Sequence, residues 1–355
     1  MQAITVTLSD HLKEKPQDES KLGFGRIFTD HMFMMDYDVD KGWYDPRIVP
    51  YHNFEMDPAS VVLHYGQAIF EGTKCYRTKD GSLQLFRPSA NMARMSRSAE
   101  RMGMPALDEE LALEGLKQLM AIEKDWVPHQ DGTSLYIRPT MISTDIQLGV
   151  HASKTYCFFI ICSPVGSYYK NGLQPVSIYV EDKYVRAVRG GTGFTKCAGN
   201  YAASILAGEI AEKKGYSQVL WLDGVEQKYV EEVGSMNMMF AYGNKIVTPM
   251  LNGSILPGIT RDSILTLARQ LGFEVEEKRI AIADVFKDGH AGSLTEAFGT
   301  GTAAVISPVG ELFMDEDKLI LQDGKIGPVA QKLYDTLTGI QYGRLPDENN
   351  WIVKL

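Results

Sequence analysis

One stretch of this sequence, residues 186–201, presents a single lysine, Lys196, in a glycine-rich turn. Three glycines precede Lys196 within the stretch, and Gly199 follows it. Because glycine adopts backbone conformations that are closed to other residues, such a turn allows the chain to approach a ligand closely. An amine held in this way is suited to imine formation with a carbonyl compound. A solvated lysine on a surface turn is the alternative that this stretch alone leaves open.

Two familiar phosphate-binding motifs are excluded at this turn. The P-loop motif requires the lysine directly after its last glycine, whereas two residues separate Lys196 from Gly193. The dinucleotide-binding motif fails because Lys196 stands where the third glycine belongs. Residues 201–214 predict an amphipathic helix that ends at Gly215. Lys196 is therefore expected just before a helix N-terminus, where backbone N–H groups favour anions.

Other segments supply anion-binding and acidic groups. Two further glycine turns, residues 256–260 and 299–304, can offer N–H groups and threonine hydroxyls to a phosphate or a carboxylate, although tight turns also serve purely structural roles. Glu231 and Glu232 adjoin an apolar segment that is expected to form a strand. We predict that one of these two carboxylates is buried. Solvent exposure of both is the alternative.

Two arginines are candidates for inward-facing positions. Arg94 lies between Met92 and Met95 in a helix expected over residues 88–101, and of the arginines of this helix it is the one predicted to point inward. Solvent exposure of these arginines is the alternative. Arg138 lies between apolar residues of a predicted strand. A buried guanidinium requires a carboxylate or a phosphate as its partner.

The composition is that of a globular protein of about two domains, with 355 residues, 44% of them hydrophobic and 23% charged. The net charge of −9 argues against nucleic acid or an anionic membrane as the main partner. The four cysteines show neither metal-binding spacing nor a disulfide pattern, which predicts reduced thiols and no metal site. The polar N-terminal segment, residues 1–22, contains no signal, transit or membrane segment, so a cytoplasmic protein is expected.

The hydrophobic periodicity predicts a mixed arrangement of strands and helices without internal repeats. We expect a smaller N-terminal α/β domain over residues 1–165, a linker over 166–175, and a larger C-terminal domain over 176–355 that carries Lys196. In the first part we expect strands between residues 23 and 62, including 26–28, a hairpin turn at 79–82, helices over 88–101 and 108–124, and strands over 135–142 and 156–162. In the second part we expect strands over 176–180, 218–222, 237–242, 245–247, 274–279, 293–298 and 304–308, and helices over 201–214, 260–271, 282–287 and 327–340.

From Leu22 to its C-terminus, the chain resembles the branched-chain-amino-acid aminotransferases of the pyridoxal-phosphate fold type IV class. The motifs that carry the resemblance occupy residues 28–32, 63–65, 70–72, 136–139, 196–201, 232–237 and 256–260. The resemblance implies a two-domain α+β fold, the D-amino-acid aminotransferase-like fold, with pyridoxal 5′-phosphate as cofactor. It also implies a homodimer.

The resemblance further implies a role for each cofactor-binding residue. Lys196 is expected to form the internal aldimine and to move the proton between the substrate Cα and C4′. Glu232 is expected to keep the pyridine nitrogen protonated, which makes the ring an electron sink. Tyr201 is expected to bond the phenolic oxygen. The phosphate is expected against Arg94, with Arg186 in support, and against the N–H groups of Ile259 and Thr260 and the hydroxyl of Thr302. Gly258 and Gly301 are also expected to bind the cofactor.

By the same resemblance, the substrate α-carboxylate is expected at the Thr302–Ala303 turn. Arg138 is expected to receive the distal carboxylate of glutamate or 2-oxoglutarate. Leu148 and Val150 are expected to close the pocket of the partner subunit. The aliphatic side chain of the substrate is expected among four aromatic residues, Tyr65, Phe70, Tyr136 and Tyr168.

The implied function is the exchange of the amino group of leucine, isoleucine or valine with 2-oxoglutarate, which yields branched-chain 2-oxo acids and L-glutamate. A D-amino-acid aminotransferase or an aminodeoxychorismate lyase would keep Lys196 and Glu232 but change the substrate pocket. The aromatic wall and Arg138 argue against both alternatives. An alternative of another class is a non-catalytic protein that binds a phosphorylated ligand, in which Lys196 only pairs with a phosphate.

Overall fold

The computed structural model describes residues 2–166 and 173–355, and the chain divides into two compact units. Unit 1 comprises Met1–Lys170, Thr195–Ala198 and Ile340–Leu355, and unit 2 comprises Asn171–Phe194 and Gly199–Gly339. This division is not the continuous one expected from the sequence, because Lys196 and the C-terminal segment are grouped with unit 1. Tyr168 and most of the expected linker lie outside the described residues.

Unit 1 is built on one nine-stranded sheet with the order β1-β3-β2-β8-β7-β5-β6-β18, and with β4 paired to β7. All neighbours are antiparallel except β1, which runs parallel to β3. The predicted hairpin joins β5 and β6. The strands are β1 (Thr5–Val6), β2 (His31–Asp38), β3 (Gly42–Pro50), β4 (Ala68–Phe70), β5 (Thr73–Arg77), β6 (Leu83–Phe86), β7 (Ser134–Ser143), β8 (Thr155–Val165) and β18 (Ile352–Lys354).

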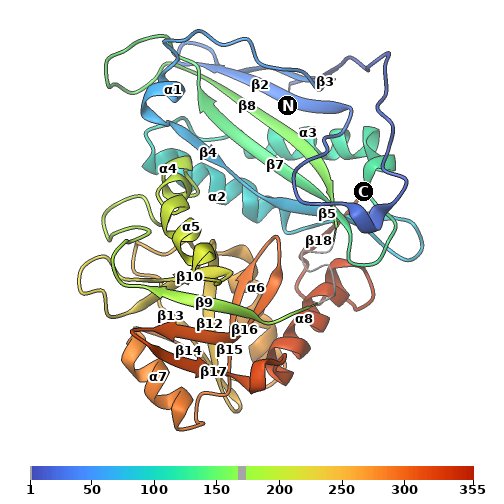
Figure 1. Ribbon diagram of the computed structural model, residues 1–355. Helices are drawn as coiled ribbons and strands as arrows, with labels where there is room; N and C mark the ends of the chain where they lie inside the picture. The colour runs from blue at the N-terminus through green and yellow to red at the C-terminus, as the bar shows by residue number, and fades with distance from the viewer. Residues whose placement is uncertain (1, 167–172) are drawn as a thin grey trace. The chain divides into compact units, whose positions relative to one another are not determined.

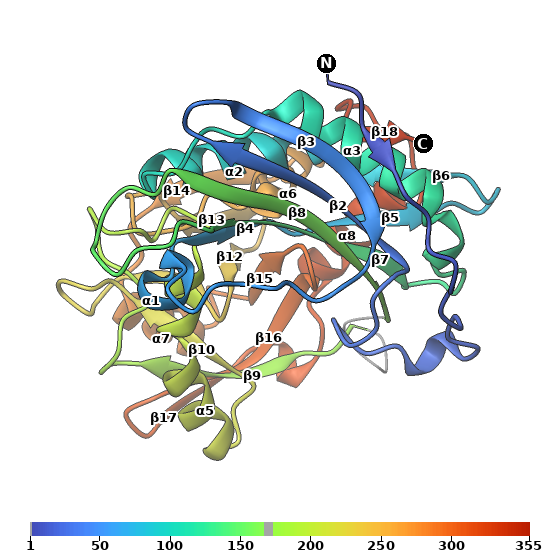
Figure 2. The same ribbon diagram turned by 90° about the horizontal axis from the view of Figure 1, so that it is seen from above.

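Helices accompany this sheet: α1 (Val61–Tyr65), α2 (Pro88–Arg101) and α3 (Glu109–Ile122). Pro88 begins α2, a position where its missing N–H removes no helical hydrogen bond. Asp108 caps α3 by accepting a hydrogen bond from the Leu111 N–H. Helix α3 contacts α2, β2 and β3, and Figures 1 and 2 show α2 and α3 running along the sheet. Their apolar faces enclose a core that includes Phe33, Leu116 and Phe158.

Unit 2 contains a second nine-stranded sheet, with the order β11-β10-β9-β16-β15-β12-β13-β14 and with β17 paired to β16. Because β11 also pairs with β12, the strands from β11 to β12 close into a ring. The strands are β9 (Val176–Glu181), β10 (Gln218–Leu222), β11 (Val230–Val233), β12 (Met236–Tyr242), β13 (Lys245–Pro249), β14 (Glu274–Lys278), β15 (Glu296–Gly301), β16 (Val305–Met314) and β17 (Asp317–Ile320).

Further helices follow Lys196 in the chain. They are α4 (Ala198–Ala202), α5 (Ile205–Lys213), α6 (Ile259–Gln270), α7 (Ile282–His290) and α8 (Pro328–Gln341). Helix α5 packs Ala207 and Ala211 against Val219 and Trp221 of β10. Short 3-10 segments are η1 (Glu19–Lys21), η2 (Lys124–Trp126) and η3 (Gln322–Gly324). Within the described residues, no helix has both the length and the apolar character needed to cross a membrane.

Two local predictions are wrong. The single helix expected over residues 201–214 is broken into α4 and α5, and the hydroxyl of Ser204 donates to the Tyr201 carbonyl at the break. A side chain that bonds nearby backbone in this way competes with continuation of a helix. The strand expected at 26–28 is a turn, since Gly25 adopts φ +67° and redirects the chain ahead of β2. Gly215 ends α5 with φ +90°, as predicted.

Candidate active site

Lys196 is held in unit 1 by backbone hydrogen bonds of its own N–H and carbonyl groups. Its carbonyl accepts from the N–H of Phe70 in β4 at 3.0 Å, and its N–H donates to Ser98 Oγ of α2 at 3.0 Å. The next residue, Cys197, forms an antiparallel bridge with Ile69. The glycine-rich turn therefore places the lysine backbone between a strand and a helix that lie more than 90 residues earlier in the chain.

The ammonium of Lys196 lies in a mixed apolar and charged environment. Its Nζ is 5.0 Å from the centroid of the Phe70 ring. Burial lowers the pKa of Lys196 to about 8, the Arg94 guanidinium acts in the same direction, and the Glu71 carboxylate opposes both. A larger fraction of the amine is therefore neutral and nucleophilic near pH 8 than for a solvated lysine. This environment favours the imine-forming role over the solvated alternative.

Glu71 is a charged residue of this site that was not predicted from the sequence. Arg94 is 4% exposed, which confirms its inward orientation, and it meets Glu71 in a two-pronged ion pair: Nε to Oε1 and Nη2 to Oε2, each at 2.7 Å. Asn91 Nδ2 also donates to Glu71 Oε2 at 2.8 Å. Burial by itself raises the pKa of Glu71, but Arg94 and Lys196 outweigh it and hold that pKa below 4.5. An inward-facing arginine implies a carboxylate partner. The position of Glu71 next to the apolar segment of β4 was the sequence feature that could have identified this partner.

We expect Glu71→Gln to lower the free energy of unfolding at pH 7 by about 3–5 kcal/mol, because it leaves the buried Arg94 without its charge partner. The pKa of Glu71 is lower in the folded state than in the unfolded state, where it is near 4.5. The ionised carboxylate therefore stabilises the fold fully above the unfolded-state pKa, and this stabilisation is lost as the pH falls through the folded-state pKa. The stability difference should therefore shrink in acid. Urea titrations from about pH 2 to 7, with the exposed Glu100→Gln of α2 as control, measure this difference. A difference independent of pH would contradict the ion-pair explanation.

Two aromatic rings of unit 1 lie against the guanidinium of Arg138. Its centre is 4.7 Å from the Phe70 ring centroid and 5.2 Å from that of Tyr136, and its Nη2 donates to the Tyr136 hydroxyl at 3.0 Å. Its Nε has no hydrogen-bond partner within the described residues. A Cβ at Gly72 would clash with the Tyr136 hydroxyl, so only glycine permits this placement. Arg138 is thus pre-positioned on two rings, and can pair with a carboxylate.

Tyr65, expected in the aromatic wall, and Leu148 and Val150, expected to close the pocket of the partner subunit, are exposed in this chain. The Tyr65 hydroxyl donates to the Leu148 carbonyl, which ties α1 to the loop at residues 146–150. Leu148 and Val150 are themselves exposed. Exposed apolar side chains on one loop are typical of a surface that contacts another molecule.

A second group of predicted residues lies in unit 2, around Glu232 of β11. Glu231 and Glu232 are both 3% exposed, so the alternative of solvent exposure is wrong. Glu232 Oε1 accepts from the Leu256 N–H at 2.7 Å and lies 3.2 Å from Arg186 Nη2. Arg186 also donates to the carbonyls of Gly193 and Ser254. Glu232 is therefore a buried carboxylate with a fixed orientation.

The predicted phosphate-binding turns are also in unit 2. Gly258 caps the N-terminus of α6, and a Cβ at this glycine would clash with Asn237 Oδ1. Asn237 also donates to the Leu256 carbonyl at 2.9 Å, which fixes the turn ahead of the helix. Thr260 follows on the first turn of α6, whose N–H groups favour an anion.

The second glycine turn begins at the end of β15 and continues into residues 302–304. Gly301 is the last residue of β15, and Thr302 and Ala303 are half-buried in the turn that follows. Thr300 of this turn was not among the predicted site residues, and it has a buried hydroxyl with no hydrogen-bond partner among the described residues. Tyr201 lies on α4, directly after the lysine turn.

Residues 68–312 match the model of the amino-transferase class IV family. The chain is 58% identical over 354 residues to branched-chain-amino-acid aminotransferase 2 of Bacillus subtilis (strain 168), with 100% of this chain and 97% of that protein covered. The chain belongs to the branched-chain-amino-acid aminotransferases of class IV. It is also 48% identical over 338 residues to the branched-chain-amino-acid aminotransferase of Mycolicibacterium smegmatis, with 94% of this chain and 92% of that protein covered. As predicted from the sequence, this chain is therefore an aminotransferase.

Solved structures of branched-chain aminotransferases share the fold type IV architecture with this chain, as predicted. The enzyme from Thermoproteus uzoniensis, solved with norvaline, has a TM-score of 0.72 at 26% identity over 91% of this chain and 99% of that one. The Escherichia coli enzyme has a TM-score of 0.73 at 26% identity over 91% of this chain and 98% of that one.

The residues of this chain fit pyridoxal 5′-phosphate, the cofactor of the family. Lys196 supplies an amine with a lowered pKa, and Glu232 supplies a buried carboxylate of fixed orientation. The glycine-capped N-terminus of α6 suits a phosphate, as does the buried hydroxyl of Thr300, which none of the described residues hydrogen-bonds. Each of these features suits one chemical group of the cofactor.

Proposed function

We propose that this aminotransferase exchanges the amino group of leucine, isoleucine or valine with 2-oxoglutarate, and that Lys196 performs the proton transfers. The lowered pKa of Lys196 carries this proposal, because an amine that is partly neutral near pH 8 can take up the proton of the substrate Cα and return it. When bound, pyridoxal phosphate supplies an electron sink for the charge that this proton leaves behind.

The other residues of the proposed site bind and orient. Glu232 accepts a hydrogen bond from the protonated ring nitrogen, for which its burial and its contacts with Leu256 and Arg186 prepare it. Tyr201 bonds the phenolic oxygen of the cofactor. The phosphate is held by the residues predicted for it, Arg94, Arg186, Ile259, Thr260 and Thr302, and the turns at Gly258 and Gly301 bring the backbone close to the cofactor. We add Thr300 to this set, because its buried hydroxyl has no hydrogen-bond partner in the described part of the chain.

The substrate is bound by the Thr302–Ala303 turn through its α-carboxylate. Phe70 and Tyr136 contact its aliphatic side chain and exclude water from it. We propose the same role for Tyr65, on grounds of the sequence resemblance. The guanidinium of Arg138 rests on the Phe70 and Tyr136 rings, so aliphatic and acidic side chains can both be accepted at one place.

The function is tested by steady-state turnover with 2-oxoglutarate of leucine, isoleucine, valine, D-alanine and an aromatic L-amino acid. The three branched-chain amino acids should give the highest kcat/KM. Turnover of D-alanine above that of leucine would contradict the proposal in favour of a D-amino-acid aminotransferase.

Arg138→Ala should lower kcat/KM for 2-oxoglutarate and glutamate by about 10- to 100-fold, whereas kcat/KM for leucine should change by less than about threefold. The guanidinium pairs with the second carboxylate, which leucine lacks. Half-reactions measured separately with leucine and with glutamate give both values, and Arg138→Lys is the control that keeps the charge but loses the planar fork. Equal losses with both substrates would show that Arg138 is structural.

We also propose that the protein is a cytoplasmic homodimer. Leu63, Tyr65, Ile146, Leu148 and Val150 are exposed apolar residues on α1 and the loop that it contacts, a surface suited to a second copy of the chain. The four cysteines are free buried thiols, consistent with a reducing compartment.

Sedimentation should give twice the chain mass of 39.6 kDa. Val150→Asp, which places a charge at the proposed interface, should shift the dimer towards monomer, whereas a charge at the exposed Val6 should not. A monomeric wild-type protein at micromolar concentration would contradict this proposal.

A further inference from the structure

A pocket of about 550 Å³ lies in unit 2, and Glu231 lines it. Glu231 and Glu232 are neighbours in β11, and successive side chains of a strand point to opposite faces of a sheet. Glu231 lines the pocket, whereas Glu232 does not. None of the residues that we assign to the cofactor or the substrate lines it. Its volume is within the roughly 300–1,000 Å³ typical of sites for small organic ligands.

Glu231 provides a buried acceptor at this pocket. Its Oε1 accepts from Asn252 Nδ2 at 3.1 Å and from the Ser254 hydroxyl. Its Oε2 is buried and has no hydrogen-bond partner within the part of the chain that the structure describes. Burial raises the pKa of Glu231, while the bonds from Ser254 and Asn252 oppose the rise. Because an unpaired buried carboxylate oxygen is costly, this atom calls for a donor from outside the protein.

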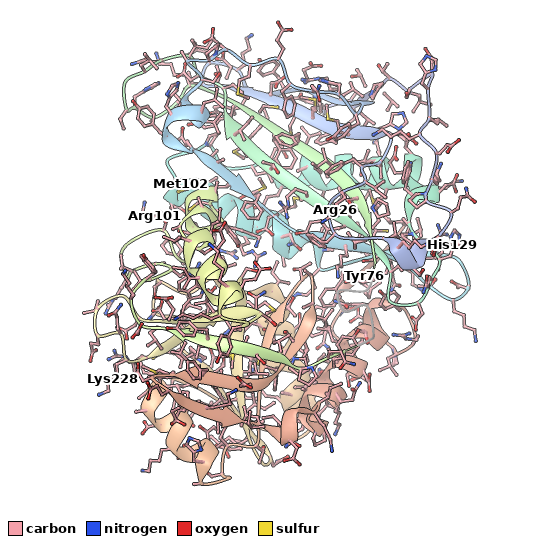
Figure 3. All side chains as sticks on the ribbon, viewed as in Figure 1. Arg26, Tyr76, Arg101, Met102, His129 and Lys228 are labelled. Atoms are coloured by element: carbon pink, nitrogen blue, oxygen red, sulfur yellow. The ribbon has the colours of Figure 1, made fainter. Side chains whose placement is uncertain are left out.

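The other acids of the pocket are already engaged. Both oxygens of Asp223 accept hydrogen bonds from the backbone N–H groups of the turn that follows it, including that of Lys228. Figure 3 shows Lys228 at the outer margin of unit 2, where it is exposed. Glu226 Oε1 pairs with Arg279 Nη2 at 2.7 Å. Glu231 is therefore the carboxylate left to bind a cationic group.

Among the cations of the pocket, Arg189 is available for a ligand. Arg279 is held by Glu226, and Lys278 Nζ lies 3.2 Å from Glu276 Oε2. Arg189 is exposed and makes no hydrogen bond or ion pair with any described residue. A guanidinium with its donors unused matches a carboxylate.

Apolar side chains form the rest of the pocket. Val225 is 82% exposed, Met250 and Leu251 are also exposed, and Ile255 is buried. Exposed apolar residues grouped around a concave site indicate a ligand with an apolar body. They do not suit a metal ion, and the described residues contain no cluster of three metal-ligating side chains.

We propose that this pocket binds a small zwitterion with an aliphatic body, the chemical class of the free α-amino acids. The ammonium of the ligand donates to Glu231 Oε2, its carboxylate pairs with Arg189, and its aliphatic part packs against Met250 and Leu251. The two charged groups of such a ligand match the carboxylate oxygen and the guanidinium that the described residues leave without partners.

The pocket is connected to Glu232 by a short chain of contacts. Ser254 donates to Glu231 through its hydroxyl and accepts from Arg186 Nη2 through its carbonyl. The same Nη2 lies 3.2 Å from Glu232 Oε1. A ligand that binds Glu231 therefore changes the surroundings of Glu232, the carboxylate that we assign to the cofactor's ring nitrogen. This link rests on the proposed function, and it makes the pocket a regulatory site that alters kcat.

The test is calorimetric titration of the holoenzyme with N-methyl-L-leucine, a zwitterion whose secondary amine cannot be transferred. Its methyl ester, which lacks the anionic carboxylate, is the matched control ligand. Arg189→Ala should weaken binding of the acid by about tenfold or more, and this variant should bind acid and ester alike. Arg269→Ala, an exposed arginine of α6 outside the pocket, should bind as the wild type does. Val225→Trp, which fills the pocket from its exposed rim, should also abolish binding. Neither pocket variant should change kcat without the ligand.

Three results would overturn the proposal. The first is no binding of the probe up to about 10 mM, where even millimolar affinity is measurable, and the second is equal binding by the Arg189→Ala and Arg269→Ala proteins. The third is stoichiometric displacement of the probe by 4-methylpentanoate, which would place the probe in the active site. Leucine turnover is measured separately. A protein that binds the probe through Arg189 but does not transaminate leucine would contradict the proposed function and support the proposed pocket. A protein that transaminates leucine but does not bind the probe would support the function and contradict the pocket.

Discussion

Lys196→Ala is expected to lower kcat for leucine and 2-oxoglutarate by at least about a thousandfold, because it removes the amine that moves the Cα proton. We expect no other lysine to replace it, since the backbone of Lys196 is fixed by Phe70 and Ser98 and its pKa is lowered by its local environment. Steady-state turnover measures the loss. The exposed Lys154→Ala serves as the matched control, and should retain wild-type activity.

The same variant should still bind the cofactor, because the substitution leaves every residue assigned to the phosphate unchanged. The cofactor, followed by its absorbance, should therefore stay with the protein through gel filtration. Denaturation without prior reduction should release it. Residual activity above about a thousandth of the wild-type value would refute the assignment of Lys196 as the proton-transferring group.

Glu232→Gln is expected to lower kcat by about a hundredfold, which corresponds to about 2.7 kcal/mol of transition-state stabilisation. The amide keeps the size of the carboxylate but loses the charge that a protonated ring nitrogen requires. The KM for leucine should change by less than about threefold, because Glu232 is not assigned to the substrate.

Glu209→Gln, an exposed carboxylate of α5, is the control for the removal of one negative charge from unit 2. Glu232→Asp, which keeps the charge but shortens the side chain, should recover part of the activity. A Glu232→Gln enzyme in which KM rises and kcat is unchanged would contradict the proposed role of this carboxylate.

Much of the local structure follows from short-range pattern. Helix α2 begins at Pro88 and ends at Arg101 as predicted, and the strands around Arg138 agree within a few residues. The prediction of one continuous helix after Lys196 was wrong because periodicity does not report how Ser204 bonds to nearby backbone. Strand β18, formed by residues near the C-terminus, was not predicted, since its partner β6 lies more than 250 residues earlier.

The sequence by itself determined the chemistry available to this protein: a lysine in a glycine turn, a carboxylate beside an apolar strand, and glycine turns ahead of helices. These are features of residue type and short spacing, which the chain carries whatever its fold. Only the tertiary structure decided which charges meet. It pairs Arg94 with Glu71, 23 residues away, and lowers the pKa of Lys196 to about 8. It also leaves one oxygen of Glu231 without a hydrogen-bond partner among the described residues. The physical reason is that burial and Coulomb interactions depend on distance in space, which residue spacing along a chain does not specify.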